Sequence, residues 1–379
     1  MDDAAEDGAG HRAQTVEEDD LSGRLAAALL AVALLLVHRI DARAAPDLSA
    51  DRVVGGLDQP VAFTFDPDGR IWYVEKATGR IGVFDQREGS DLAFATVPGV
   101  RGEGERGMLG IALHPRYPGR PLVYVYATRS VSGSLRNQIL RFRDDAGSGA
   151  ARRVLFSSPA SSSAYHDGGR ISFGPDGMLY AVVGDGHDPS RSQILSREHR
   201  GKILRLQPSG RAPRDNPFDD RVFAYGIRNS FGFAFDPRTG RLWETENGPA
   251  CNDEINLIRA GRNYGWGPSA TCTGSSPGNT NRDGPNPVRP KAFYVDPIGI
   301  TGIAFCDGCG LGRRSEGAAF WGSVNDGRVT RAILNARRDG IDRRTVVYRH
   351  PGGTLSFEVG PDGRIYFSDF GAIYVLRRT

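Results

Sequence analysis

The sequence predicts an all-β protein, a six-bladed β-propeller of four-stranded antiparallel blades. A short phrase that reads as a turn followed by a strand recurs six times along the chain. The copies spread over roughly 330 residues, about 55 for each, which suits four-stranded blades with long loops. No convincing amphipathic helix follows residue 46, and this argues against alternating strands and helices.

The residues of the recurring phrase favour a β-turn followed by a strand. Proline presets the first turn dihedral, Asp-Gly tolerates positive φ, and the aromatic and β-branched residues that follow suit a pleated strand. Each copy therefore predicts a hairpin. The four clearest copies are Asp66–Tyr73, Gly174–Tyr180, Asp236–Trp243 and Gly360–Phe367, and looser copies occur at His114–Tyr117 and Glu316–Trp321.

The two ends of this repeating region are expected to meet. Asp51–Val54 reads as an early strand and Ile373–Leu376 as a late one. If they share a blade, the ring of blades is closed by strands from both ends of the region.

Residues 1–45 are interpreted as a signal peptide or an N-terminal membrane anchor, and residues 46–379 as the propeller domain. Leu25–Val37 contains only Leu, Ala and Val, and Ala42–Ala45 has the small-x-small form of a cleavage site. The apolar run is short for a bilayer span of about 20 residues. Export to a secreted or extracytoplasmic location is favoured, with no integral membrane domain beyond this segment.

Composition limits the class of partner. The formal net charge is +3 over 379 residues, and no run of Lys and Arg is interleaved with aromatic residues. This pattern gives no indication of nucleic-acid binding. A small molecule is the expected ligand.

The four cysteines form two local pairs, Cys251 with Cys272 and Cys306 with Cys309. An exported chain meets an oxidising compartment, so two disulfides are predicted. The alternative is a four-cysteine zinc site, but only the second pair has C-x-x-C spacing.

Candidate chemistry lies in loops that precede or follow predicted strands. His166 stands beside glycines just before the strand-like Ile171–Phe173, and histidine suits a general base at neutral pH. Arg228 lies in a similar loop and could hold an anion or a developing oxyanion. Gly102–Gly107 formally matches GxGxxG, but no crossover helix follows, so it is discounted as a dinucleotide site.

The oxygen-rich turn Glu244–Pro249 suits a hard cation such as calcium, which accepts backbone carbonyls as well as carboxylates. Loops at one face of a propeller converge on its axial channel, so residues far apart in the sequence can build one pocket there.

Taken together, these segments resemble the glucose/sorbosone dehydrogenase family, soluble aldose sugar dehydrogenases that depend on pyrroloquinoline quinone (PQQ). The resemblance runs from about Val53 to Leu376. Its most specific motifs are Gly107-Met108-Leu109-Gly110, His166-x-Gly168-Gly169-Arg170, Gly226-x-Arg228-Asn229, Glu246-x-Gly248-Pro249, Asp253–Ile258 and Asn263–Trp266.

The resemblance implies a role for each matching residue. His166 matches the base that removes the proton from the anomeric hydroxyl, and Arg228 matches the residue that stabilises the reduced quinone oxygen. The carbonyls of Gly248 and Pro249 match the calcium ligands. Cofactor contacts are expected from Asn229 and Arg228, together with Tyr165 and Glu105 in the neighbouring loops.

This chain also departs from the family pattern. Glu105 stands where glucose-oxidising members often have Gln. Asn325 occupies the position of an expected lysine, and Gly353 and Leu355 occupy positions of expected arginines. PQQ is a tricarboxylate, so these changes remove charge-assisted partners worth about 1.5–3 kcal/mol each. Arg349 and His350, just upstream, are candidates to replace them.

The leading interpretation is PQQ- and calcium-dependent oxidation of aldose sugars or related alcohols to lactones, with hydride transfer to the quinone and an unknown electron acceptor. A second is a non-catalytic propeller that binds carbohydrate or protein and has lost the cationic side chains that would hold the quinone. A third is a metal-dependent lactone hydrolase, for which Glu105, Asp185 and Glu246 are the obvious carboxylates.

Overall fold

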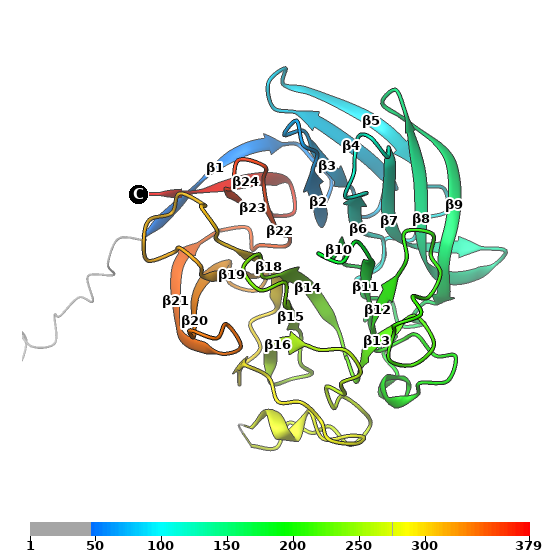
Figure 1. Cartoon of the computed structure of the whole chain (residues 1–379), viewed down its shortest axis with the longest axis vertical. Coiled ribbons are helices and arrows are strands. Elements are labelled where there is room, and N and C mark those ends of the chain that lie inside the picture. Colours follow the sequence, from blue (N-terminus) through cyan, green and yellow to red (C-terminus); the bar gives the residue numbers. More distant parts are fainter. Residues whose placement is uncertain (1–46, 275) are drawn as a thin grey trace, which may run out of the picture. The chain divides into compact units, whose positions relative to one another are not determined.

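Six four-stranded antiparallel sheets surround a common axis in the computed structural model, which describes residues 47–274 and 276–379 (Figure 1). The predicted six-bladed propeller is confirmed. From the axis outward, the first blade holds β2 (Ala62–Phe65), β3 (Ile71–Val74), β4 (Arg80–Asp85) and β5 (Ser90–Thr96), and the second holds β6 (Met108–Leu113), β7 (Leu122–Val131), β8 (Ser134–Asp145) and β9 (Ser148–Pro159).

The third blade holds β10 (Ile171–Phe173), β11 (Leu179–Val183), β12 (Lys202–Leu206) and β13 (Val222–Tyr225), and the fourth holds β14 (Ser230–Phe235), β15 (Leu242–Glu246), β16 (Asp253–Ile258) and β17 (Ala292–Tyr294). The fifth consists of β18 (Ile300–Phe305), β19 (Ala319–Ser323), β20 (Arg328–Leu334) and β21 (Ile341–Arg349). The sixth consists of β22 (Phe357–Val359), β23 (Ile365–Ser368), β24 (Ala372–Arg378) and β1 (Leu48–Gly55).

The sixth blade closes the ring as expected. β1 pairs antiparallel with β24, from Leu48 opposite Arg378 to Gly55 opposite Ala372. The first described strand is therefore held by the last one, and the two ends of the propeller lie together (Figure 1).

The recurring phrase marks the same position in every blade, the connection between the innermost strand and the second strand. In the first copy, Oδ1 of Asp66 accepts hydrogen bonds from the backbone N–H groups of Asp68 and Arg70, both at 3.0 Å, and Gly69 has φ 87°. The third and sixth blades have glycine in place of Asp66, and there Asp176 and Asp362, two positions later in the phrase, each accept one backbone N–H, from Met178 and from Arg364. The turn residues predicted from the sequence thus stabilise these hairpins in the structure.

Apolar side chains between neighbouring blades form the core. Trp72 of β3 packs with Phe94 and Tyr117, so aromatic rings join the first and second blades. Trp243 and Trp321 belong to a second cluster between the fourth and fifth blades. The innermost strands of the fourth and fifth blades approach closely at one point, where a Cβ on Gly232 would lie 2.7 Å from the Cα of Gly302.

Both predicted disulfides are confirmed, Cys251–Cys272 and Cys306–Cys309. Helix in the described residues is limited to two short 3-10 segments, η1 (Pro189–Gln193) and η2 (Pro277–Asn279). Neither has the length or apolar character that a bilayer crossing requires. The signal or anchor segment predicted for residues 1–45 lies outside the described residues.

Candidate functional site

A cavity of about 600 Å³ opens where the six blades meet, and every blade contributes to its lining. Six of the predicted site residues line it: Glu105, Tyr165, His166, Arg228, Asn229 and Gly248. Pro249 is exposed and is not part of the lining.

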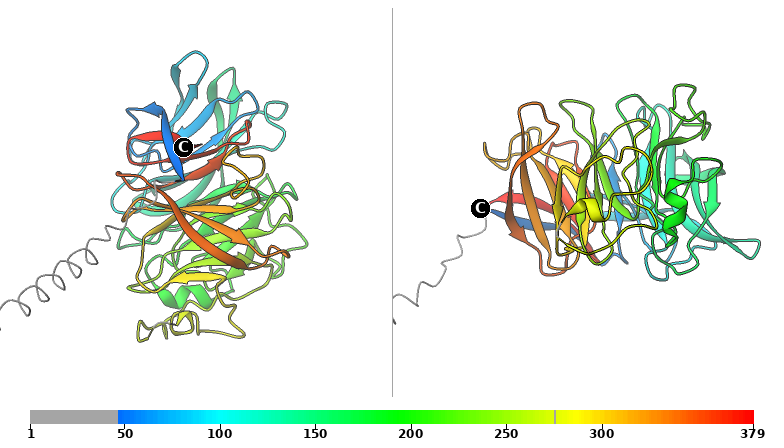
Figure 2. Two further views of the ribbon diagram at one scale, coloured as in Figure 1. Left: turned by 90° about the vertical axis from the view of Figure 1, so that its left-hand side faces the viewer. Right: turned by 90° about the horizontal axis from the view of Figure 1, so that it is seen from below.

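The topology explains why these residues meet. Consecutive antiparallel strands reverse direction, so the segment before the innermost strand and the loop after the second strand lie at the same end of a blade. His166 precedes β10, Arg228 precedes β14, and Gly248 follows β15. The recurring hairpins described above join the same strands at the opposite ends of the blades. Figure 2 shows the propeller from the side, with loops projecting from both of its ends.

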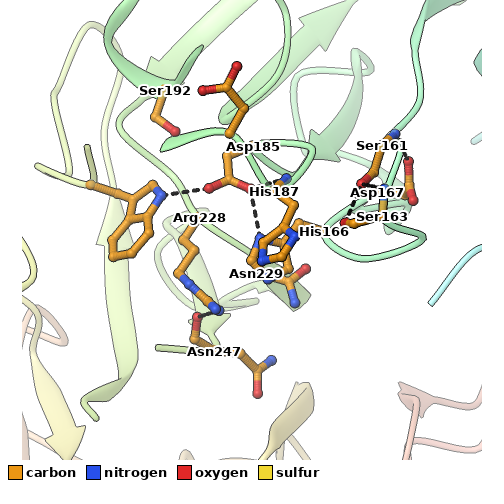
Figure 3. Close-up of polar contacts among 12 residues, drawn as sticks. Ser161, Ser163, His166, Asp167, Asp185, His187, Ser192, Arg228, Asn229 and Asn247 are labelled. Atoms are coloured by element: carbon orange, nitrogen blue, oxygen red, sulfur yellow. Dashed lines mark hydrogen bonds and ion pairs between the residues drawn. The ribbon is translucent and has the colours of Figure 1, made fainter. Parts of the chain in front are cut away.

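His166 is paired with a buried carboxylate. Its Nδ1 lies 2.7 Å from Oδ1 of Asp185, which is fully buried in the loop between β11 and β12 (Figure 3). A carboxylate can only accept, so Nδ1 carries the proton and Nε2 keeps its lone pair. This arrangement suits a base that takes a proton from a hydroxyl group.

Asp185 is itself held in place on both of its oxygens. The backbone N–H of His187 donates to Oδ1 at 2.7 Å, and the indole N–H of Trp266 donates to Oδ2 at 2.7 Å. These donors fix the orientation of the carboxylate, and through it the orientation of the His166 ring.

The backbone of His166 has φ 62°, in the left-handed region that non-glycine residues rarely adopt. Its N–H donates to Oε2 of Glu105 at 2.8 Å, and the side-chain amide of Asn229 donates to the same oxygen at 3.1 Å. Glu105 thus joins loops of the second, third and fourth blades. Tyr165 is 49% exposed and lies at the cavity, with its ring 6.3 Å from that of His187.

Arg228 reaches the cavity from the fourth blade. Its Nη1 donates to the carbonyl of Asn247 at 2.8 Å (Figure 3), and its guanidinium lies 5.3 Å from the centre of the Trp266 ring. Its Nε is buried and has no hydrogen-bond partner among the described residues. Burial lowers the pKa of Arg228, although an arginine stays protonated at any physiological pH. The group can therefore stabilise a negative charge in the cavity.

The turn after β15 presents free backbone oxygens. The N–H of Gly248 donates to Oδ1 of Asp253 at 3.0 Å, which fixes the turn. Within residues 47–274 and 276–379, no hydrogen bond ends on the carbonyl oxygen of Gly248 or Pro249. Such carbonyls are suitable calcium ligands.

A layer of buried carboxylates lies behind this turn. Glu244, Glu246 and Glu254 all accept from the side-chain amide of Asn256, and Glu246 also accepts from the backbone N–H of Arg228. Burial raises the pKa of Glu246 to about 7, and burial together with repulsion from Glu246 raises that of Glu254 to about 8. None of these three carboxyl groups belongs to the cavity lining.

The carboxylates considered for a lactone hydrolase have other partners. Asp185 holds His166, Glu246 lies behind Arg228, and Glu105 holds the backbone of the His166 loop. In the described part of the chain, no group of three or more His, Cys, Asp or Glu side chains could hold a metal ion.

The side of the cavity formed by the fifth and sixth blades carries no charged side chain among its lining residues. Val324, Leu355 and Phe370 line it. Arg349 and His350 do not reach the lining; Arg349 pairs with Asp326 at 2.5 Å, and Nε2 of His350 lies 2.8 Å from Oδ2 of Asp369. The suggestion that they replace the missing cations is wrong, because nearby carboxylates hold both side chains.

Sequence reasoning missed two residues of the site. Asp185 appeared only as a metal-ligand candidate, yet it is the partner of His166. Trp266 appeared only as part of a motif, yet it contacts both Asp185 and Arg228. One signal was available for Asp185: its loop follows the second strand of a blade, and loops in that position line the channel mouth.

Fold and site define a β-propeller whose axial cavity is lined by an imidazole, a guanidinium and the Gly248 residue of a turn with free carbonyl oxygens. The chain belongs to the glucose/sorbosone dehydrogenase family, because the family model described as Glucose / Sorbosone dehydrogenase matches residues 57–372.

Sequence and structural similarity to several sugar dehydrogenases supports this family assignment. Aldose sugar dehydrogenase YliI of Escherichia coli is 28% identical, over 82% of this chain and 86% of that protein. Quinoprotein glucose dehydrogenase B of Acinetobacter calcoaceticus is 32% identical, over 56% of this chain and 51% of that protein. The PQQ-bound aldose sugar dehydrogenase of Streptomyces coelicolor superposes with a TM-score of 0.74 and 28% identity, covering 88% of this chain and 99% of that one.

A relative of another kind is the human Hedgehog-interacting protein. It is 31% identical over 48% of this chain, and the match covers 31% of that protein. Sequence similarity to about half of this chain therefore also occurs in a protein that is named for an interaction.

Proposed function

We propose that this protein oxidises aldose sugars or related alcohols to lactones, with PQQ and calcium as cofactors. The observation that carries the proposal is the convergence of three groups on one cavity: His166 with its Asp185 partner, the guanidinium of Arg228, and the free carbonyl of Gly248. An oxidation at a hydroxyl-bearing carbon needs a proton acceptor and a site for negative charge beside it.

His166 would take the proton from the anomeric hydroxyl through Nε2. The Asp185 carboxylate stabilises the imidazolium that forms, since it already accepts from Nδ1 at 2.7 Å. Glu105 and Asn229 hold the loops that carry the base and the cation, and Tyr165 lies at the cavity, where it can contact a bound ring.

The residues present fit the two cofactors. The buried Nε of Arg228 lacks a partner, and the Gly248 and Pro249 carbonyls accept no hydrogen bond in the described structure. Arg228, Asn229 and the Gly248–Pro249 turn would hold PQQ and calcium. When bound, PQQ supplies the acceptor for the two electrons and hydrogen removed from the sugar carbon, and calcium polarises its quinone.

The test is reconstitution of the purified protein with PQQ and Ca²⁺, followed by an assay of aldoses with a dye as artificial electron acceptor. Wild type should reduce the dye, and His166→Asn should lose about 10²–10⁴-fold in kcat. His114→Asn is the matched control, because His114 is buried but lies in the β6–β7 turn. The absence of both dye reduction and PQQ binding in wild type would refute the proposal.

A second candidate function is a non-catalytic propeller that binds carbohydrate. It is favoured by Asn325, Gly353 and Leu355, which provide no cation where the family pattern has lysine and arginines. Calorimetry with free sugars and no PQQ distinguishes the two functions. Binding that survives His166→Ala and needs no cofactor supports the second function.

We also infer that the chain is exported. The two disulfides support this, since disulfides persist in oxidising compartments. Cell fractionation, with N-terminal sequencing of the recovered protein, tests export and tells whether the N-terminal segment has been removed.

A further inference from the structure

The described residues that line the cavity include three cations and one carboxylate: Lys76, Arg170, Arg228 and Glu105. Arg228 donates to Asn247 beside the proposed base. Arg170 faces Glu358 on β22, with its Nη1 3.8 Å from Oε1. Like Arg228, Lys76 has no carboxylate of the described structure within ion-pair distance of its charged group, but unlike Arg228 it has no part in the proposed function so far.

The position of Lys76 is fixed by its backbone. Its N–H donates to the carbonyl of Gln59 at 3.2 Å, and its own carbonyl accepts from the N–H of Met108 at 2.8 Å. A Cβ on Gly107 would lie only 2.2 Å from that carbonyl oxygen. Glycine is therefore needed at position 107, and the first and second blades are joined at the residue that carries the ammonium group.

The side chain of Lys76 is half-buried and has spare hydrogen-bonding capacity. Its Nζ donates to the carbonyl of Gly102 at 2.6 Å, and this is its only described acceptor. An ammonium group has three donors, so two remain for another acceptor. Burial lowers the pKa of Lys76, and the nearby carboxylates of Asp58, Glu103 and Glu105 partly offset this effect. A bound anion would stabilise the charged form further.

We propose that Lys76 anchors a carboxylate of the molecule that occupies this cavity. The inference rests on the proposed function, since PQQ is a tricarboxylate and the Val324 and Leu355 side chains, from the fifth and sixth blades, provide no cation for it. The first blade would thus supply the charge that the fifth and sixth blades lack. The same chemistry would also recognise the carboxylate of a sugar acid, so the experiment distinguishes the two sources.

The first arm measures PQQ affinity by calorimetry in the presence of Ca²⁺. Lys76→Met keeps the length of the side chain and removes its charge, and it should weaken binding about 10- to 100-fold, whereas Lys76→Arg should stay within a few fold of wild type. Lys291→Met is the matched control, because Lys291 is equally half-buried but lies outside the cavity. Circular dichroism shows whether each variant is folded.

The second arm compares kcat/KM for glucuronate and glucose in PQQ-saturated enzyme. If Lys76 serves the substrate, Lys76→Met lowers this ratio by at least tenfold and leaves PQQ affinity unchanged. A fall in PQQ affinity alone assigns it to the cofactor, and either result supports the proposal. If wild type turns over sugar and Lys76→Met changes neither quantity, this inference is overturned and the proposed function stands. If wild type binds no PQQ, both are overturned.

Discussion

The imidazole of His166 and the carboxylate of Asp185 lie 2.7 Å apart, although they belong to different loops of the third blade. Both loops are at the channel end of the blade, one before β10 and one after β11. The pairing leaves Nε2 as the proton acceptor, and it links the base to a fully buried anion.

Replacement of Asp185 by asparagine should lower kcat by about 10²–10⁴-fold and leave PQQ binding within a few fold. The carboxylate accepts from His166, His187 and Trp266, and an amide cannot accept on both of its atoms. An amide N–H facing Nδ1 would place the imidazole proton on Nε2, where it blocks the base. Steady-state kinetics and calorimetry on the same preparation check this. Unchanged kcat would show that the pair has no part in catalysis.

Trp266 contacts Asp185 through its indole N–H and Arg228 through its ring, so the two contacts can be tested separately. Trp266→Phe removes the hydrogen bond to Asp185 and keeps an aromatic ring beside Arg228. We expect kcat to fall about tenfold, which corresponds to the lower end of the free energy of a hydrogen bond to a charged group. The pH dependence of kcat should also shift. A purely structural role would lower thermal stability without moving the pH profile.

The matched control for Trp266 is Trp243→Phe. Trp243 is also buried, but its indole N–H has no hydrogen-bond partner among the described residues. This substitution should leave both kcat and its pH profile unchanged. Equal effects from the two substitutions would remove the special role of Trp266.

Gly248→Ala should raise the Ca²⁺ concentration needed for half-maximal dye reduction by about tenfold or more. Substitutions that disturb the surroundings of metal ligands typically weaken metal affinity by about this factor. A Cβ at this position would lie 1.9 Å from the carbonyl oxygen of Cys251, so the turn must move. Gly371→Ala is the control, because a Cβ there meets nothing within 4 Å. Titration of the chelator-treated protein with Ca²⁺ measures the effect, and an unshifted midpoint would contradict the assignment of this turn.

The fold could be predicted because short, contiguous segments of the sequence specify each hairpin. Each copy of the recurring phrase carries its own turn chemistry, as the hydrogen bonds of Asp66 illustrate, and the spacing of the copies sets the blade size. The closing pair of strands also follows from the pattern, because β1 and β24 are the strands left at the two ends of the region.

The site was only partly predictable because its contacts are not local. His166 and Arg228 stand out as reactive types in unusual loops, but the partner of His166 is 19 residues away and the indole that holds that partner is 81 residues further on. Side-chain direction also matters. Arg349 and His350 are cationic or titratable residues near the expected positions, yet Asp326 and Asp369 hold them outside the cavity.

The buried carboxylates behind the Gly248 turn predict how stability depends on pH. The pKa of Glu254 is raised to about 8 by burial and by repulsion from Glu246, above its value in an unfolded chain, near 4.3. The folded protein therefore binds more protons between these values. This contribution to stability is complete below the unfolded pKa and is lost as the pH rises through the folded one.

The melting temperature of wild type should consequently fall between pH 6 and pH 9, where ordinary carboxyl groups are already ionised. Glu254→Gln should flatten this decline, because an amide cannot ionise and still accepts from Asn281, which now donates to the carboxylate at 2.7 Å. The melts are recorded with a chelator present, so that no cation neutralises the cluster. Glu88→Gln, on an exposed turn, should keep the wild-type slope. Parallel slopes for all three proteins would show that Glu254 is ionised in the folded state throughout this range.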